Sequence, residues 1–259
     1  MQLIYKGTFL KLLYSTILFI FITCSQETIA DEITLAADSW CPINCEPNSD
    51  KSGFMVEITR YIFAQQGHTI KYLKIPWLRA IKLAEKGKIN GVIGAYKGDS
   101  KQLIFPQHEQ ALLNNACYVL KDNPWNYTDT SSLENHTLGI VRGYDYGDEI
   151  NKYIKRAKKS NLIIITGTEN LTERLLTLLE RKRADIVLET DIVYQHIAKK
   201  LGVTSMFRFA GESALPSKSY VAFSPMLSTS KNYAEILSDG MVEIRKSGKL
   251  AQIMEKYGL

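Results

Sequence analysis

Apolar and polar positions along this chain alternate between two periods. Short, largely apolar runs typical of strands occupy residues 33–37, 69–75, 89–96, 114–121, 138–142, 162–165, 184–188 and 220–223. Between them, apolar residues recur every three or four positions at 53–66, 77–86, 147–158, 191–200, 230–246 and 249–257, and in a helix that begins after Asn170. Strands that alternate with helices predict an α/β fold with mainly parallel sheets covered on both faces.

The alternation is interrupted once, by a polar stretch from Asp122 to Ser132. Such a stretch is typical of a linker, so we expect two sheets, one in each of two lobes. In open α/β sheets, ligands bind beyond the carboxyl ends of the strands. A site shared by two lobes would then consist of strand-to-helix loops at the cleft between them. Asn170 with Glu173 predicts a capping box at one helix start.

Residues 1–30 are typical of a cleaved secretory signal. Lys6 and Lys11 flank the start of an apolar run over 12–22, shorter than the about 20 residues that span a bilayer. Thr28 and Ala30 supply small residues for cleavage. Two alternatives remain: an N-terminal anchor, and a lipoprotein at Cys24, although Thr23 replaces the usual small residue before a lipidated cysteine. We therefore expect a periplasmic protein of residues 31–259.

The charge of the chain argues against nucleic acid as a partner. The sequence holds 32 basic and 27 acidic residues, of which 30 and 26 lie beyond residue 30. A surplus this small is not typical of nucleic-acid binding. The basic clusters at 152–159 and 181–183 are interpreted as solvated helix faces.

Three cysteines lie beyond the signal: Cys41, Cys45 and Cys117. In an exported protein we expect a disulfide between Cys41 and Cys45, which lie close together in one Pro-containing loop. A metal site is the alternative, but the four histidines are scattered, so we expect neither metal nor cofactor. Cys117 lies in an apolar strand pattern and should be a buried thiol.

Several local motifs follow one another along residues 31–259. They are DSWCP at 38–42, GFMVEI at 53–58, PW at 76–77 with RA at 79–80, LAEKGKINGVIG at 83–94, LGIVRG at 138–143, and SGKL with KYG at the end of the chain. In this order they resemble the bacterial extracellular solute-binding proteins of family 3, many of which bind amino acids for ABC importers. The resemblance implies a two-lobed, type II periplasmic-binding-protein-like fold with the ligand cleft between the lobes.

The resemblance also implies how the chain is divided. The first lobe would be discontinuous, residues 31–120 with 219–259, and the second lobe would cover 121–218. Chain crossings near 119–122 and 218–221 would be hinges at which the lobes close over a ligand. A monomer is expected, because such a protein presents both lobes to a partner.

Four candidate ligand-binding residues follow predicted strands of the first lobe. Trp40 and Trp77 match positions where the family places aromatic walls, with simple packing as the alternative for each. Asp38 can accept a hydrogen bond from a ligand amine, or cap a local turn. Tyr96 lies in the loop that offers backbone and hydroxyl groups to the ligand in the family.

Charged candidates of the first lobe depart from the family pattern. Arg79 suits a carboxylate or phosphate, but an ion pair with Glu57 or Glu85 is an equal alternative. The family usually has, after the third strand, an Arg that grips an α-carboxylate. Here the segment has no Arg and looks shortened, and only Lys97 or Lys101 can supply the charge. An ordinary α-amino-acid ligand is therefore in doubt.

The second lobe contributes candidates from two loops. They are Arg142, Tyr144, Asp145, Tyr146, Glu189, Thr190 and Asp191. Asp145 complements the dipole of the helix that follows, which favours a polar or cationic ligand over an anion. The family's ammonium-binding Asp falls at Thr190, so Glu189 or Asp191 would substitute, with capping of the helix that it begins as the alternative for Asp191. The aromatic and acidic candidates together predict a ligand with a cationic or hydroxylated part.

The resemblance implies a binding protein without enzymatic activity. It would capture a small polar solute, an amino acid or related compound, and deliver it to an ABC-type membrane permease. One alternative is a ligand-sensing module for a membrane receptor. Another is a dehydratase-like enzyme on the same fold, with Glu189 or Asp145 as the acid group. No Ser-His-Asp or Cys-His arrangement is visible in the sequence, so binding is favoured.

Overall fold

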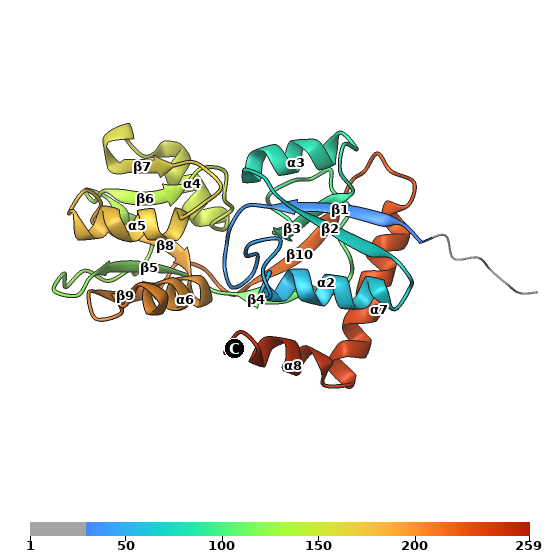
Figure 1. Ribbon diagram of the computed structural model, residues 1–259. Helices are drawn as coiled ribbons and strands as arrows, with labels where there is room; N and C mark the ends of the chain where they lie inside the picture. Colours follow the sequence, from blue (N-terminus) through green and yellow to red (C-terminus); the bar gives the residue numbers. More distant parts are fainter. Residues whose placement is uncertain (1–29) are drawn as a thin grey trace, which may run out of the picture. The chain divides into compact units, whose positions relative to one another are not determined.

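The computed structural model describes residues 30–259, which form two five-stranded sheets with helices packed on them (Figure 1). The predicted signal peptide, and Cys24 with it, lies outside the described residues. In the described part of the chain, no helix has both the length and the apolarity that a membrane crossing requires.

The first of two sheets has the strand order β2-β1-β3-β10-β4. Its strands are β1 (Glu32–Ala37), β2 (Thr69–Lys74), β3 (Gly91–Ala95), β4 (Ala111–Leu113) and β10 (Ser217–Phe223). β1 runs parallel to β2 and β3, whereas β10 is antiparallel to β3 and β4. The carboxyl ends of β1, β2 and β3 therefore lie at one edge of the sheet.

Helices cover both faces of this sheet because its central strands are apolar on both sides. Ala36, Val92 and Ala222 share one face with α3 (Trp77–Glu85). Residues one position away face the other side, where α2 (Phe54–Ala64) and α7 (Ser230–Lys246) pack. There, Phe63 lies edge-on to both Phe223 and Tyr233. The terminal helix α8 (Lys249–Glu255) packs on α2 and α7.

The second sheet repeats this plan with the order β7-β6-β8-β5-β9. Its strands are β5 (Asn115–Leu120), β6 (Leu138–Val141), β7 (Leu162–Ile165), β8 (Ile186–Thr190) and β9 (Phe207–Glu212). β6 runs parallel to β7 and β8, and β5 is antiparallel to β8 and β9. Residues of α4 (Asp148–Arg156) pack on one face, and those of α5 (Leu171–Glu180) and α6 (Asp191–Leu201) on the other. Two 3-10 turns, η1 (Thr130–Leu133) and η2 (Lys159–Asn161), complete this lobe. The prediction of a two-lobed α/β fold is confirmed.

The passage of the chain between the sheets differs from our expectation. We placed the strand over 114–121 in the first lobe, but β5 pairs with β8 and β9 in the second sheet. The chain leaves the first sheet after Leu113 and returns to it at Ser217. Short strands β4 and β9 were not expected from the sequence, because the apolar run of β4 is only three residues long and β9 mixes apolar with charged residues.

The stretch from Asp122 to Ser132 is not a linker between the lobes. The guanidinium of Arg208, on β9, donates to the backbone oxygens of Asn123 and Trp125, both at 2.5 Å from Nη2. The indole of Trp125 donates to the oxygen of Ser132 at 2.9 Å. These contacts hold the polar stretch against the second sheet, and sequence polarity alone does not reveal them.

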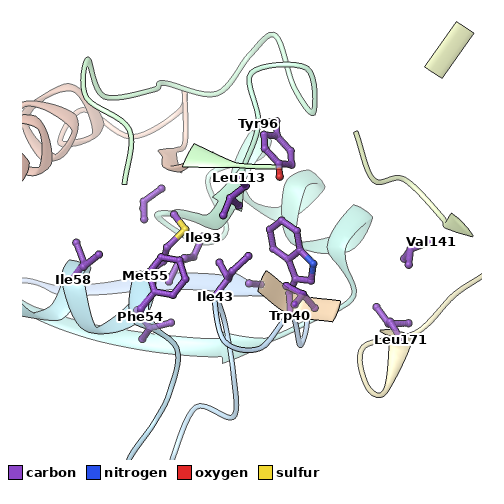
Figure 2. Packing of buried hydrophobic residues seen from close by; sticks show 14 of the residues in the cluster. Trp40, Ile43, Phe54, Met55, Ile58, Ile93, Tyr96, Leu113, Val141 and Leu171 are labelled. Atoms are coloured by element: carbon purple, nitrogen blue, oxygen red, sulfur yellow. The ribbon is translucent and has the colours of Figure 1, made fainter. Parts of the chain in front are cut away.

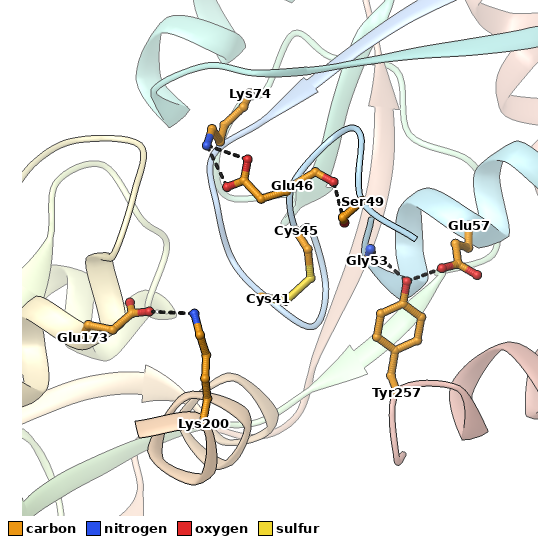
Figure 3. Close-up of a disulfide and its surroundings, with 10 residues drawn as sticks. All are labelled: Cys41, Cys45, Glu46, Ser49, Gly53, Glu57, Lys74, Glu173, Lys200 and Tyr257. Atoms are coloured by element: carbon orange, nitrogen blue, oxygen red, sulfur yellow. Dashed lines mark hydrogen bonds and ion pairs between the residues drawn. A yellow bond between two sulfur atoms is a disulfide. The ribbon is translucent and has the colours of Figure 1, made fainter. Parts of the chain in front are cut away.

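Of three smaller predictions, two are confirmed and one is wrong. The disulfide between Cys41 and Cys45 is confirmed, in a loop that also carries the ion pair between Glu46 and Lys74 (Figure 3). Cys117 is buried and free, as expected. The capping box is wrong: Asn170 has φ 53° and its side chain makes no capping hydrogen bond. A side-chain N-cap needs an extended backbone at that residue.

We predict that Gly53→Ala destabilises the protein by about 3 kcal/mol or more. Gly53 precedes α2 with φ +110°, and an added Cβ would lie 2.3 Å from the backbone oxygen of Ile43. Gly67→Ala is the matched control, because Gly67 has φ +79° with open space around it. Gly67→Ala should lower the free energy of unfolding by about 1–2 kcal/mol, the penalty for an alanine in the left-handed backbone conformation. Urea unfolding of both variants measures the difference, and equal losses would contradict the steric argument.

Candidate functional site

Five of the predicted residues meet where strands of both sheets end. Asp38 follows β1, Trp77 begins α3 just after β2, and Tyr96 follows β3. From the second sheet, Tyr144 follows β6 and Glu189 is the penultimate residue of β8. Loops at the carboxyl ends of parallel strands are the expected place for a ligand in this class of fold.

These loops enclose a cavity of ≈ 20 Å³, about the space of one water molecule. It is lined by Asp38, Trp40, Asn44, Trp77, Ile93, Gly94, Tyr96, Asp99, Tyr144 and Asp145. Both lobes contribute lining residues, so the site is complete only when the two lobes meet.

Two hydrogen bonds between side chains connect the lobes at the cavity. The hydroxyl of Tyr144 donates to Oδ2 of Asp38 at 2.7 Å. The indole Nε1 of Trp40 donates to Oε1 of Glu189 at 3.0 Å. Farther out, the amide of Ser39 donates to the oxygen of Thr168 at 2.9 Å, so the contact also includes backbone.

Aromatic rings form the walls of the cavity. Trp40 lies edge-on to Tyr96, with 6.3 Å between ring centroids, and to Tyr144, with 6.0 Å. Figure 2 shows the hydroxyl of Tyr96 turned towards the indole of Trp40. On the third side, Nε1 of Trp77 donates to Oδ1 of Asp99 at 3.3 Å. Aromatic faces of this kind can attract a cation.

Glu189 is buried and held by three donors. Besides Trp40, the hydroxyl of Thr172 donates to Oε2 at 2.6 Å, and the amide of Thr190 donates to Oε1 at 2.8 Å. The side chain is 4 % exposed. Because α5 supplies Thr172 and the first lobe supplies Trp40, this carboxyl group joins three separate parts of the fold.

Burial shifts the titration of the three carboxyl groups around the cavity. It raises the pKa of Asp38 to about 7, against the hydrogen bond from Tyr144, and the charge of Glu189 raises it further. Burial likewise raises the pKa of Asp99 to about 7, against hydrogen bonds from Tyr96 and Trp77. The pKa of Glu189 is also raised by burial, which its hydrogen-bond donors only partly offset. The ionised forms are therefore costly here.

Two buried polar atoms at the cavity have no hydrogen-bond partner within the described chain: Oδ1 of Asn44 and the hydroxyl of Tyr96. The Tyr96 hydroxyl approaches Thr190, but Thr190 donates its own hydroxyl to Asn115 at 2.7 Å. The contact between the Tyr96 hydroxyl and Thr190 does not have the geometry of a hydrogen bond, so the Tyr96 hydroxyl is unpaired within residues 30–259. Unpaired polar atoms in a closed site are what a ligand would satisfy.

The basic candidates of the first lobe do not reach the cavity. Arg79 and Lys101 are exposed, and Lys97 places its Nζ 5.6 Å from the ring centroid of Tyr220. The suggested partners of Arg79 have other contacts: Glu57 pairs with Lys256, and Glu85 accepts from Ser100. None of the three basic residues lines the cavity.

The second-lobe candidates divide into two groups. Tyr144, Asp145 and Glu189 reach the lobe contact, although Asp145 also accepts from the amides of Gly147 and Asn151. Three other candidates make hydrogen bonds within the second lobe. Tyr146 accepts from the amide of Val141 in the core, Thr190 bonds Asn115, and Asp191 accepts from the hydroxyl of Tyr118.

An open groove of ≈ 320 Å³ adjoins the cavity. Asp99, Tyr144 and Asp145 line both spaces, and the exposed side chains of Arg142 and Lys155 line only the groove. Residues 30–259 contain no group of three or more His, Cys, Asp or Glu arranged to hold a metal ion.

Sequence reasoning missed two polar residues of the cavity, Asn44 and Asp99. Asp99 lies three residues after Tyr96 in the loop that follows β3, and its Oδ2 accepts from the amide of Tyr96 at 2.7 Å. Its position in that loop was a usable signal. Asn44 offered none, because it reaches the site only through the disulfide loop, where its amide bonds the oxygen of Trp40.

Comparison with known proteins places this geometry in context. The profile of the bacterial extracellular solute-binding proteins, family 3, matches residues 33–259. A histidine kinase sensor domain with similarity to periplasmic binding proteins is similar in structure, at TM-score 0.71 and 18 % identity, covering 87 % of this chain and 95 % of its own. An ancestral arginine-binding protein bound to arginine is also similar in structure, at TM-score 0.71 and 17 % identity, covering 89 % of this chain and 99 % of its own.

A third similar structure is an amino acid ABC transporter substrate-binding protein from Streptococcus pneumoniae bound to L-arginine. Its TM-score is 0.68 at 15 % identity, over 89 % of this chain and 95 % of its own. At these identities the likeness shows the fold alone. The search among curated proteins found no match.

We predict that Glu189→Ala lowers the free energy of unfolding by about 3 kcal/mol or more, because it leaves buried donors of Trp40, Thr172 and Thr190 unpaired. Glu189→Gln is the matched control. Its amide oxygen still accepts from two donors, so its loss should stay within about 1.5 kcal/mol. Denaturant unfolding measures both; an equally large loss in Glu189→Gln would mean that charge, rather than hydrogen bonding, stabilises this position.

The raised pKa of Asp38 predicts a pH dependence of ligand-free stability. Because burial disfavours the ionised form, this contribution is fully present below pH about 4 and is lost as pH rises to about 7. The loss is on the order of 2–4 kcal/mol at most, since opening of the lobes relieves it. Asp38→Asn should flatten the profile of melting temperature against pH, whereas Asp50→Asn, an exposed residue, should keep it. Parallel profiles for the wild type and Asp38→Asn would contradict this assignment.

Proposed function

Because this chain belongs to the bacterial extracellular solute-binding proteins of family 3, we propose that it captures a small polar solute between its two lobes and delivers it to an ABC-type permease. The periplasm is the proposed compartment, in keeping with the export signal expected from residues 1–30. A monomer is the proposed form, since both lobes must face the permease.

One observation carries this proposal: a small cavity is closed by hydrogen bonds from one lobe to the other. Asp38 and Trp40 of the first lobe bond Tyr144 and Glu189 of the second. A site built across two lobes opens when they separate and encloses a solute when they meet. We propose the stretches between the sheets, near 114 and 213–216, as the hinges, rather than the crossings that the family resemblance implied.

The proposed ligand-binding residues are those that line the cavity or close it. They are Asp38, Trp40, Trp77, Tyr96, Asp99, Tyr144, Asp145 and Glu189. Tyr146, Thr190 and Asp191 support them from behind, through hydrogen bonds within the second lobe. Arg79, Lys97, Lys101 and Arg142 are left out because they do not line the cavity.

A sensory role is the second candidate, and one observation favours it. A histidine kinase sensor domain shares this fold at TM-score 0.71. In that role the closed form would contact a separate membrane receptor instead of a permease. An enzyme is disfavoured because the acids at the cavity are held by structural donors, as Glu189 is by Thr172 and Trp40.

Fluorescence of the cleft tryptophans tests solute capture directly. The chain has three tryptophans; Trp40 and Trp77 line the cavity, and Trp125 lies in the second lobe away from it. In a Trp125→Phe background, emission should change on binding of one class among amino acids, amines, sugars, osmolytes and cyclic acids. A solute at 100 times its Kd should also stabilise the protein by about 2.7 kcal/mol.

The outcomes separate the candidate functions. Saturable binding without chemical change of the solute supports capture, and conversion of the solute, followed by NMR, would establish an enzyme instead. Reconstitution with a permease in vesicles then distinguishes delivery from sensing. If no solute changes either the emission or the melting temperature, the proposal of solute capture is wrong.

A further inference from the structure

The cavity has a charge imbalance that the chain itself does not correct. Asp38 and Glu189 are buried beside it, and Asp99 and Asp145, which are half-buried, line it. The neighbouring charges that act on these groups are also acidic: Glu189 acts on Asp38, and Asp145 acts on Asp99. No Lys, Arg or His lines the cavity in the described chain. Acid groups placed together in this way favour a positively charged partner.

A second observation, independent of charge, points to a ligand. Oδ1 of Asn44 and the hydroxyl of Tyr96 are buried at the same cavity without hydrogen-bond partners. The side chains of Asn44 and Tyr96 are only 1 % and 9 % exposed. Together with Asp38 they present acceptors to one small space. Asn44 Oδ1 and Asp38 accept, and the Tyr96 hydroxyl can accept as well as donate, so a group with several N–H donors, such as an ammonium or a guanidinium, can satisfy all three.

In this closed form a side chain of the protein occupies the place of such a donor. The hydroxyl of Tyr144 gives its proton to Asp38, 2.7 Å away. The ring of Tyr144 packs edge-on against Trp40. With this arrangement the remaining space is ≈ 20 Å³, which suits one water-sized group. A larger ligand needs more space than this arrangement leaves, and moving the Tyr144 side chain off Asp38 would provide it.

We propose, on the basis of the solute-binding function above, that the ligand is an organic cation with N–H donors, an amine or a guanidine, that needs no carboxylate. Its cationic group replaces the Tyr144 hydroxyl as the partner of Asp38. Asn44 and Tyr96 accept further hydrogen bonds, and Trp40 and Trp77 flank the charge. The rest of the ligand extends past Tyr144 into the adjoining groove.

The basic residues nearest the site do not reverse this reasoning. Arg142 and Lys155 are exposed in the groove. Asp99 and Asp145 line both the groove and the cavity, so they lie between the two spaces. A carboxylate in the cavity would meet only acidic and neutral side chains there. It would lose its hydration without a compensating charge.

Paired probes test the ligand class. The pairs are agmatine with L-arginine, cadaverine with L-lysine, and tyramine with L-tyrosine, in which the two members differ by one carboxylate. In titrations of the purified protein we expect at least one amine to bind about tenfold or more tightly than its amino acid, a difference of about 1.4 kcal/mol. Tetramethylammonium, which has no N–H donor, should not compete.

Tyrosine variants test displacement of the hydroxyl. Tyr144→Phe removes the competitor for Asp38, so the amine should bind about threefold to tenfold more tightly, the worth of one hydrogen bond. Tyr233→Phe is the matched control, because the Tyr233 hydroxyl also donates to an aspartate, Asp31, at 2.6 Å, in the first lobe outside the cavity. The Tyr233→Phe variant should bind the amine with unchanged affinity. Asp38→Asn should weaken amine binding about tenfold or more at an unchanged circular-dichroism spectrum.

Opposite results overturn the inference in distinguishable ways. If an amino acid binds as tightly as its amine, the ligand class is wrong. If a neutral or anionic solute binds and the amines do not, the inference fails while the proposed function stands. If Tyr144→Phe weakens amine binding, the hydroxyl contacts the ligand rather than giving way to it. If no solute of the broad panel binds, the proposed function fails, and the inference fails with it.

Discussion

The desolvation of carboxyl groups at the meeting point of two lobes is the constraint on which the rest of the site depends. Asp38 and Glu189 are buried and Asp99 is half-buried, and desolvation raises the pKa of all three, so it opposes their ionised forms. The protein compensates with neutral donors: a tyrosine hydroxyl, two indoles, a threonine hydroxyl and backbone amides. Two of these donors, the hydroxyl of Tyr144 and the indole of Trp40, bond from one lobe to the other, so the contact between the lobes and the protonation of Asp38 and Glu189 depend on the same groups.

The two sheets make this arrangement possible because each directs its parallel strand ends towards the other. β1 and β3 deliver Asp38 and Tyr96, and β6 and β8 deliver Tyr144 and Glu189. Rigid strands bury the backbone and fix the loops, while the loops remain free to vary in chemistry. This division explains how the family fold is kept while the loop after β3 lacks the usual arginine. The same loop carries Asp99, which lines the cavity, whereas its lysines do not.

Much of the candidate site could be predicted from the sequence. Where the structure departs from the prediction, the physical cause can be identified. Aromatic and acidic residues predicted near strand ends line the cavity or bond across it, because the carboxyl ends of the parallel strands of each sheet lie together. Lys97 and Lys101 were suggested because the predicted site needed a positive charge. Both side chains are long and exposed, so they are free to turn to solvent, and Lys97 lies over the ring of Tyr220. Asn44 was missed because its position depends on a disulfide loop folded back on Trp40.

The sequence by itself determined the kind and order of the elements, the disulfide between near neighbours, and the general location of the site. Each of these follows from local periodicity or short separation. Only the tertiary structure decided that β5 belongs to the second sheet, that Arg208 holds the polar stretch after β5, and that Tyr144 bonds Asp38 across 106 residues of chain. Such choices depend on strand order and on which buried groups find partners. Those are properties of the assembled fold, and no short window of sequence contains them.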